Sequence, residues 1–148
     1  MPLIGIIAKK REAQLINKEL KGKDIKIIEI TKESIKNVKN ISFEEIIVLE
    51  DIKLESEEYK YMNEIISKTK YLILNGDIKI GFLNEIDIEK PIKVITFGFN
   101  TKATISISSV KEEKIIESQE KEIRLSKEND KKIYTKLVTF IIKELHNL

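Results

Sequence analysis

The sequence predicts an α/β fold: a three-layer, Rossmann-like domain with a mostly parallel sheet of about five strands and antiparallel strands added in the C-terminal part. Two short apolar runs, Tyr71 to Leu74 and Ile92 to Phe97, are each stopped by Asn or Gly. This pattern is typical of strands buried on both faces of a parallel sheet. After Asn100 the pattern changes to alternation of apolar and polar residues, which favours strands with one solvent-exposed face.

Size and composition narrow the class of protein. The 148 residues are 41% hydrophobic and 35% charged, which fits one domain, residues 1–148, with a single core. The 27 basic and 25 acidic residues are interspersed and leave a net charge of +2, so charge does not indicate a nucleic-acid partner. The absence of Cys excludes disulfides and thiolate catalysis and agrees with a reducing compartment. No apolar run suits a signal peptide or a membrane span, so we expect a cytoplasmic protein.

The N-terminal half alternates between strand and helix patterns. Leu3 to Ala8 is the first expected strand, in which Gly5 allows close approach of a neighbouring backbone. Lys9 to Leu20 has apolar residues three and four apart, and this helix is expected to end before Gly22. The elements expected next are a strand from Ile25 to Ile30, a short helix or turn from Thr31 to Ile41, a strand from Glu45 to Leu49 and an amphipathic helix from Glu57 to Thr69.

The C-terminal third predicts a polar meander and a final helix. Ala103 to Ser109 alternates, and Lys114 to Ile116 and Lys121 to Leu125 extend it as a hairpin or meander. Lys131 to Leu145 carries a wide apolar stripe, which we expect to pack on the sheet. If it did not, the stripe would be the best candidate for a partner surface or a homodimer contact. The sequence specifies neither a protein partner nor an oligomeric state.

Candidate binding residues follow the ends of the expected strands. Ligands of open α/β sheets bind at the carboxyl edge, so polar residues in those loops are candidates for a small-ligand or nucleotide site. We expect that site to use Lys9, Lys10, Glu50, Asn75, Asp77 and Asn100.

Each candidate also has a purely structural interpretation. Asn-Gly-Asp and Gly-Phe-Asn are common turn sequences, because Asn and Gly tolerate positive φ and Asp caps the next segment. The cations from Lys9 to Arg11 suit a solvated turn as well as an anion site. Glu50 and Asp51 could ligate Mg²⁺, but without a phosphate-binding loop an exposed turn is favoured. His146, the only His, suits a helix-end position better than catalysis. We expect no catalytic residue, no metal and no cofactor.

Three short motifs, in order, resemble the central ATP-binding domain of the Mur ligases, the amide ligases of peptidoglycan precursors. They are Ile47-Val48-Leu49-Glu50, Leu74-Asn75-Gly76-Asp77 and Ile95-Thr96-Phe97-Gly98, the last followed by the alternating strand. The resemblance spans Glu45 to Val110 and implies a magnesium-binding role for Glu50 and a position beside adenine for Asn75. Ile78 replaces the second Asp of the family motif.

The departures from that family determine the functional expectation. The first strand runs into Ala8-Lys9-Lys10 where the family has a Gly-x-Gly-Lys-Thr/Ser loop. The 148 residues also leave no room for the C-terminal substrate domain of the family, so we expect none. Backbone donors and the loop lysine supply most of the phosphate neutralisation in such enzymes. The resemblance therefore implies a non-catalytic, Mur-ligase-like protein that acts in the bacterial cytoplasm as a binding or regulatory domain, linked to the cell envelope or sporulation. The alternative is the small-ligand or nucleotide-binding module at the carboxyl edge.

Overall fold

The computed structural model describes residues 1–87, 91–99, 105–110, 113–117, 122–125 and 130–148. Side chains are described for residues 1–87, 91–99 and 132–148. Its centre is a parallel sheet of five strands in the order β2-β1-β3-β4-β5. The strands are β1 (Leu3–Ile7), β2 (Lys26–Glu29), β3 (Glu45–Val48), β4 (Tyr71–Asn75) and β5 (Lys93–Gly98). The prediction of an α/β fold with a parallel sheet of about five strands is therefore confirmed.

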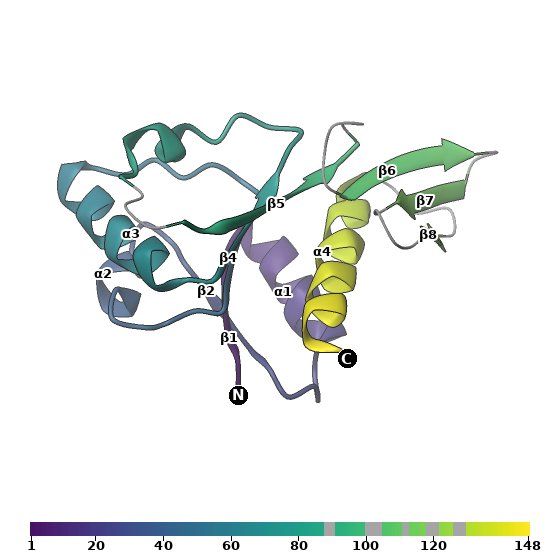
Figure 1. Cartoon of the computed structure of the whole chain (residues 1–148), viewed down its shortest axis with the longest axis horizontal. Coiled ribbons are helices and arrows are strands. Elements are labelled where there is room, and N and C mark those ends of the chain that lie inside the picture. Colours follow the sequence, from purple (N-terminus) through teal and green to yellow (C-terminus); the bar gives the residue numbers. More distant parts are fainter. Residues whose placement is uncertain (88–90, 100–104, 111–112, 118–121, 126–129) are drawn as a thin grey trace.

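Helices cover both faces of this sheet, as the three-layer prediction requires (Figure 1). The 3₁₀ helix η1 lies in the spacer between β4 and β5, where the sequence predicted no regular structure. The helices are α1 (Lys10–Glu19), α2 (Ile35–Val38), α3 (Ser56–Lys68), η1 (Gly81–Glu85) and α4 (Asp130–His146).

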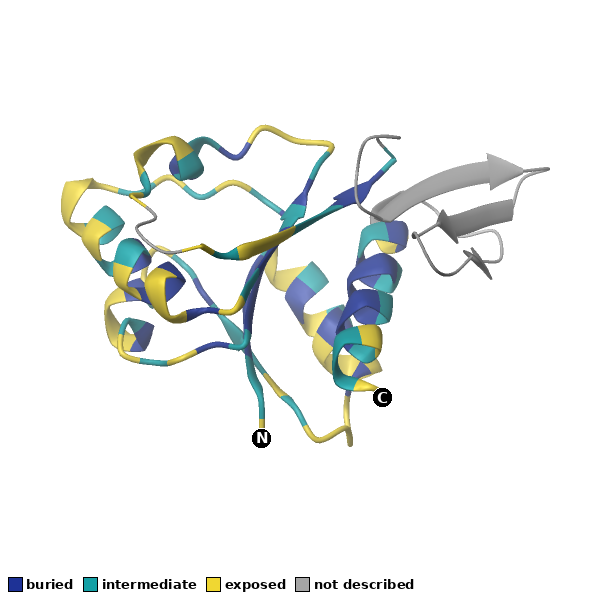
Figure 2. Cartoon of the chain, viewed as in Figure 1, coloured by how far each residue is buried: buried dark blue, intermediate teal, exposed yellow. Residues whose placement is uncertain are grey.

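Two apolar clusters hold the layers together. On one face α1 and α4 pack on the sheet around Ile6, Ile47 and Phe97, which are fully buried. On the other face α2, α3 and η1 pack around Ile46, through side chains that include Phe82. Figure 2 shows the buried residues concentrated along the strands and on the inner sides of the helices. The final helix therefore packs on the sheet as expected and does not leave its apolar stripe open.

The chain continues past β5 into three further strands. β6 (Ile105–Val110) pairs parallel to the end of β5, at Phe97 and Gly98. β7 (Glu113–Glu117) pairs antiparallel to β6, and β8 (Glu122–Leu125) pairs antiparallel to β7. In Figure 1 these strands extend away from the helices that flank the central sheet.

Two local expectations were wrong. The atoms that a Cβ at Gly5 would meet belong to side chains and not to a neighbouring backbone. A Cβ at this position would lie 2.7 Å from the side-chain Cδ1 of Ile30, so the glycine makes room for side chains. The first half of β5 is not buried on both faces, since Val94 is 50% exposed. Apolar composition alone does not show whether every residue of a strand is covered.

Candidate functional site

The strand order creates a crevice at the carboxyl ends of β1 and β3. From β1 the chain turns to α1 on one face of the sheet, whereas from β3 it turns to α3 on the opposite face. Because the connections leave in opposite directions from neighbouring strands, no helix covers the gap between them. This reversal point is where open α/β sheets bind their ligands.

A cleft of about 370 Å³ occupies this position. The loops that follow β1, β2 and β3 form its walls, so segments distant in sequence meet there. Its volume falls within the range of small-ligand sites, roughly 300–1,000 Å³. The cleft is lined by Ile7, Ala8, Lys9, Ile30, Thr31, Lys32, Glu50, Asp51 and Ile52.

Charges of both signs surround the cleft, and they differ in how closely they are paired. The Lys9 Nζ lies 3.6 Å from a carboxylate oxygen of Glu50, and these side chains are 73% and 37% exposed. Lys32 reaches α3 on the other side, where its Nζ lies 2.6 Å from Glu58 Oε1. The hydrogen bond to Glu58 raises the pKa of Lys32, and the same contact lowers the pKa of Glu58. The Lys9–Glu50 contact is the exposed one, and exposed ion pairs contribute little to stability and exchange readily.

The start of α1 presents a carboxylate beside the cleft. The backbone N–H of Lys9 donates to Glu12 Oε1 at 3.1 Å, so one of the amide donors at this helix end is satisfied internally. Burial raises the pKa of Glu12, the bond from Lys9 opposes that rise, and the negative charge of Glu50 adds to it. A further negative group placed here would meet repulsion from both Glu12 and Glu50.

Asp51, also in the cleft wall, anchors the loop that contains η1. Its Oδ1 accepts the backbone N–H of Ile52 at 2.9 Å and that of Phe82 at 3.2 Å. A Cβ on Gly81 would lie 3.0 Å from the second carboxylate oxygen, so the glycine lets the loop pass close to Asp51. The role of this side chain is to fix the loop after β3 against the loop after β4.

The Asn-Gly-Asp sequence after β4 forms a hydrogen-bonded turn. Asn75 is buried, donates from Nδ2 to the carbonyl of Leu49 at 3.2 Å and accepts the N–H of Asp77 at 3.0 Å. Asp77 Oδ2 accepts the N–H of Phe99 and the hydroxyl of Tyr134, both at 2.7 Å. These bonds connect β4 to its two neighbouring strands and to α4.

The six predicted site residues therefore fall into separate groups. Lys9 and Glu50 meet in the wall of the cleft. Lys10 is exposed at the first position of α1 and does not line the cleft. Asn75 and Asp77 meet each other in the turn after β4, and Asn100 lies outside the described residues. Their role in ligand binding stays a prediction.

A buried ionisable pair lies at the opposite edge, where the sequence predicted none. His146 Nε2 lies 2.7 Å from Glu45 Oε1, and the two side chains are 14% and 2% exposed. Burial raises the pKa of Glu45, and the hydrogen bond from His146 lowers it by less. The available signal was a carboxylate opening the otherwise apolar strand Glu45-Ile46-Ile47-Val48, together with a single His in the chain. The pair ties the end of α4 to the start of β3.

No protein-family model matches the chain, and no curated protein matches it. Within the part of the chain that the structure describes, no three His, Asp or Glu side chains are grouped so that they could hold a metal ion. In the same residues, no helix combines the length and apolar character needed to cross a membrane. The functional argument therefore depends on the cleft itself.

Proposed function

We propose that the protein is a non-catalytic binding domain that takes a small polar ligand in the cleft at the carboxyl edge of β1, β2 and β3. The observation that carries this proposal is the position of the cleft at the reversal point of the strand order. Its exposed, weakly paired Lys9 and Glu50 supply one charge of each sign to a ligand. Rearranging them costs little, because exposed ion pairs are worth about 0–1 kcal/mol.

The electrostatics favour a ligand with few negative charges. A triphosphate site uses several free backbone donors and a lysine at the start of the first helix. Here Glu12 accepts the N–H of Lys9, and Glu50 adds a second carboxylate nearby. Ala8-Lys9-Lys10 also lacks the glycines that let a loop wrap phosphate. These features support the proposal that the domain binds a ligand without driving phosphoryl transfer.

We also retain the Mur-ligase-like relationship as a proposal. Its three motifs end β3, β4 and β5, which are neighbours in the sheet, so their order along the chain corresponds to adjacent positions on one edge. Asn75 is engaged with Leu49, so the expected contact with adenine would require that bond to break. The proposed role is a binding or regulatory one in the bacterial cytoplasm, linked to the cell envelope or sporulation.

Calorimetric titration and thermal-shift measurements against ATP, ADP, AMP and UDP-linked cell-wall precursors test the proposed function. We expect binding of a ligand with few negative charges, weakened by Lys9→Ala and Glu50→Gln and unchanged by Lys18→Ala on the exposed side of α1. Sustained ATP hydrolysis by the purified chain would disprove the non-catalytic role. Binding that survives both cleft substitutions would place the site elsewhere.

We further propose that the antiparallel strands after β5 belong to the same folded unit. The parallel pairing of β6 with the end of β5 and the antiparallel pairing of β7 and β8 support this. Hydrogen exchange tests it: amides of β6 to β8 protected together with those of β5 are expected, and exchange at the rate of an unfolded peptide would contradict it.

A further inference from the structure

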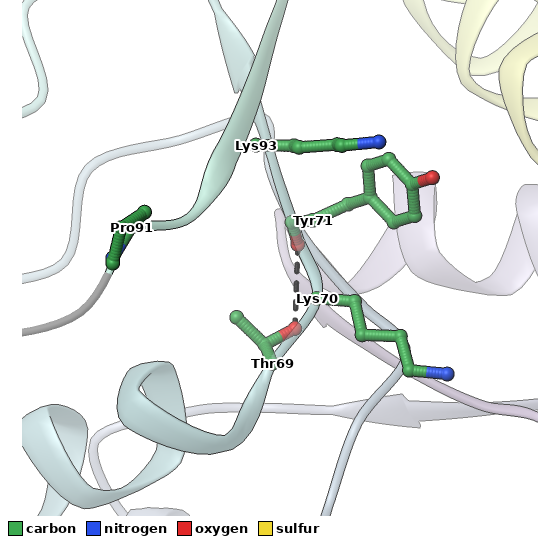
Figure 3. Close-up of a pocket in the computed structure, with 5 residues that line it drawn as sticks. All are labelled: Thr69, Lys70, Tyr71, Pro91 and Lys93. Atoms are coloured by element: carbon green, nitrogen blue, oxygen red, sulfur yellow. Dashed lines mark hydrogen bonds between the residues drawn. The ribbon is translucent and has the colours of Figure 1, made fainter.

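A second cleft lies at the opposite edge of the sheet, where β4 and β5 begin. Its volume is about 330 Å³, and it is far from the candidate site because parallel strands keep their two ends apart. Figure 3 shows that one strand start supplies Thr69, Lys70 and Tyr71 and the other supplies Pro91 and Lys93. No predicted site residue belongs to this cleft.

Two lysines flank an aromatic ring in this cleft. Lys93 is the cross-strand neighbour of Tyr71, and its Nζ lies 5.8 Å from the centre of the Tyr71 ring. In Figure 3 the side chains of Lys70, Tyr71 and Lys93 project to the same side of the strands, with the ring between the two lysines. The regular pairing of β4 with β5 fixes the backbone beneath all three.

Both lysines are available to a ligand, because neither is held in a buried ion pair. Lys70 Nζ lies 3.1 Å from Glu44, but these side chains are 69% and 36% exposed, so water or a ligand can replace this contact. Lys93 forms no ion pair with any carboxylate of the described residues. Glu45, the register partner of Tyr71, is bonded to His146 and buried.

The remaining polar side chain stiffens the cleft. The Thr69 hydroxyl lies 3.2 Å from the Glu44 carbonyl and 3.3 Å from the Tyr71 carbonyl, and it donates to the backbone instead of facing a ligand. Figure 3 shows the bond to Tyr71 holding the entry of β4. The cleft therefore combines two exposed cations, one neighbouring exposed carboxylate and an apolar ring on a rigid base.

We propose that this amino-edge cleft binds a small organic anion, with its carboxylate or phosphate at the ammonium group of Lys93 and its apolar body against the Tyr71 ring, while Lys70 adds a second positive charge on the other side of the ring. Ammonium groups form charge-assisted hydrogen bonds with such anions. The ring offers a flat apolar surface at small entropic cost. This cleft is independent of the proposed function, because the two sites share no residue.

Titration of the full chain with phenyl phosphate, followed by calorimetry and by amide chemical shifts, tests the proposal. We expect binding that shifts the amides of residues 69–71 and 91–93, weaker binding of inorganic phosphate, and none of phenol. Lys93→Gln should weaken phenyl phosphate about tenfold, as loss of one charge-assisted bond predicts. Tyr71→Leu should weaken phenyl phosphate while leaving inorganic phosphate unchanged.

Lys60→Gln is the matched control, because Lys60 is an exposed lysine of α3 outside the cleft and its substitution removes the same charge. An equal loss of binding in Lys60→Gln would show nonspecific attraction and overturn the proposal. Absence of any shift at millimolar phenyl phosphate would also overturn it. Lys9→Ala should leave this binding unchanged, so failure here and failure of the carboxyl-edge proposal are separable.

Discussion

The carboxyl edge of the sheet contains two regions of polar side chains that differ in how they are engaged. Above β4 and β5, the side chains of Asn75 and Asp77 are bound to the protein itself. Above β1 and β3, Lys9 and Glu50 make one exposed contact at 3.6 Å beside a cleft. Both regions follow strand ends, so position at the carboxyl edge does not by itself identify a binding residue.

The difference arises from the elements that pack over each strand end. Tyr134 of α4 lies edge-on to Phe97 and Phe99, with ring centres 6.3 and 5.9 Å away, and so brings its hydroxyl to Asp77. Over β1 and β3 the chain leaves toward opposite faces, and the gap remains open. We infer that the first region stabilises the fold and that the second is available to a ligand.

The largest expected effect is that of Gly98→Ala. Gly98 has a φ of 141°, and a Cβ there would collide with the Asp77 carboxylate. Strain in the backbone and overpacking together should cost about 3 kcal/mol of unfolding free energy. Chemical denaturation measures this loss.

Gly22→Ala provides the control for that measurement. Gly22 also has a positive φ, of 83°, but a Cβ there would meet nothing within 4 Å. Its substitution should cost only about 1 kcal/mol, the penalty for the left-handed conformation. Equal losses at Gly22 and Gly98 would contradict the proposed collision with Asp77.

The next effect is that of Asp77→Ala, which removes the acceptor of two short hydrogen bonds. We expect a loss of about 2 kcal/mol, because hydrogen bonds to charged groups contribute more than neutral ones. Tyr134→Phe, which removes one donor and keeps the ring contacts, should cost about 1 kcal/mol. A double-mutant cycle by denaturation measures their coupling, and additive losses would mean that the hydroxyl does not depend on Asp77.

Most of the fold was predictable because buried faces leave a periodic pattern in the sequence. The spacing that predicted α3 places Met62, Ile65 and Ile66 in the core, and the expected strands at Leu3 and Tyr71 begin at the observed residues. The exposed start of β5 was not predictable, since exposure depends on which elements pack over a strand. Helix packing of this kind is a tertiary property that one strand's composition does not encode.

The site was predictable only in part. Loop position identified Lys9 and Glu50, which meet in the cleft, and the turn interpretation of Asn75 and Asp77 agrees with their hydrogen bonds. The partner of Asp77 on α4 is separated from it by 57 positions, and no local pattern encodes such a contact. The amino-edge cleft was missed because binding residues were expected only after strand ends, whereas its lysines lie where β4 and β5 begin.

Glu45 is a buried carboxylate at the amino edge of the sheet, where β3 begins. Its folded pKa is raised above the ordinary value of 4.5, chiefly by burial, so the unfolded state loses its proton first. The free energy of unfolding should therefore fall as the pH rises from about 4.5 to the folded pKa of Glu45, and it should level off at higher pH. This effect should be smaller than that at Asp77.

Glu45→Gln tests this sign, because glutamine imitates the protonated acid and still accepts a hydrogen bond from His146. Denaturation across pH should give equal stabilities for the two proteins in acid and a more stable variant above that range. A less stable variant at neutral pH would show that the interaction of the Glu45 carboxylate with His146 outweighs the cost of burial.

The smallest effect on stability is expected at the candidate site itself. Lys9→Ala and Glu50→Gln each remove one side of an exposed contact at 3.6 Å, and exposed pairs contribute about 0–1 kcal/mol. Unfolding free energies should therefore stay within about 0.5 kcal/mol of the wild-type value. Together with the loss at Asp77, this would show that one set of carboxyl-edge charges holds the fold while the other remains available to a ligand. A loss of about 2 kcal/mol or more at Glu50 would instead assign the cleft wall a structural role of the kind that Asp77 has.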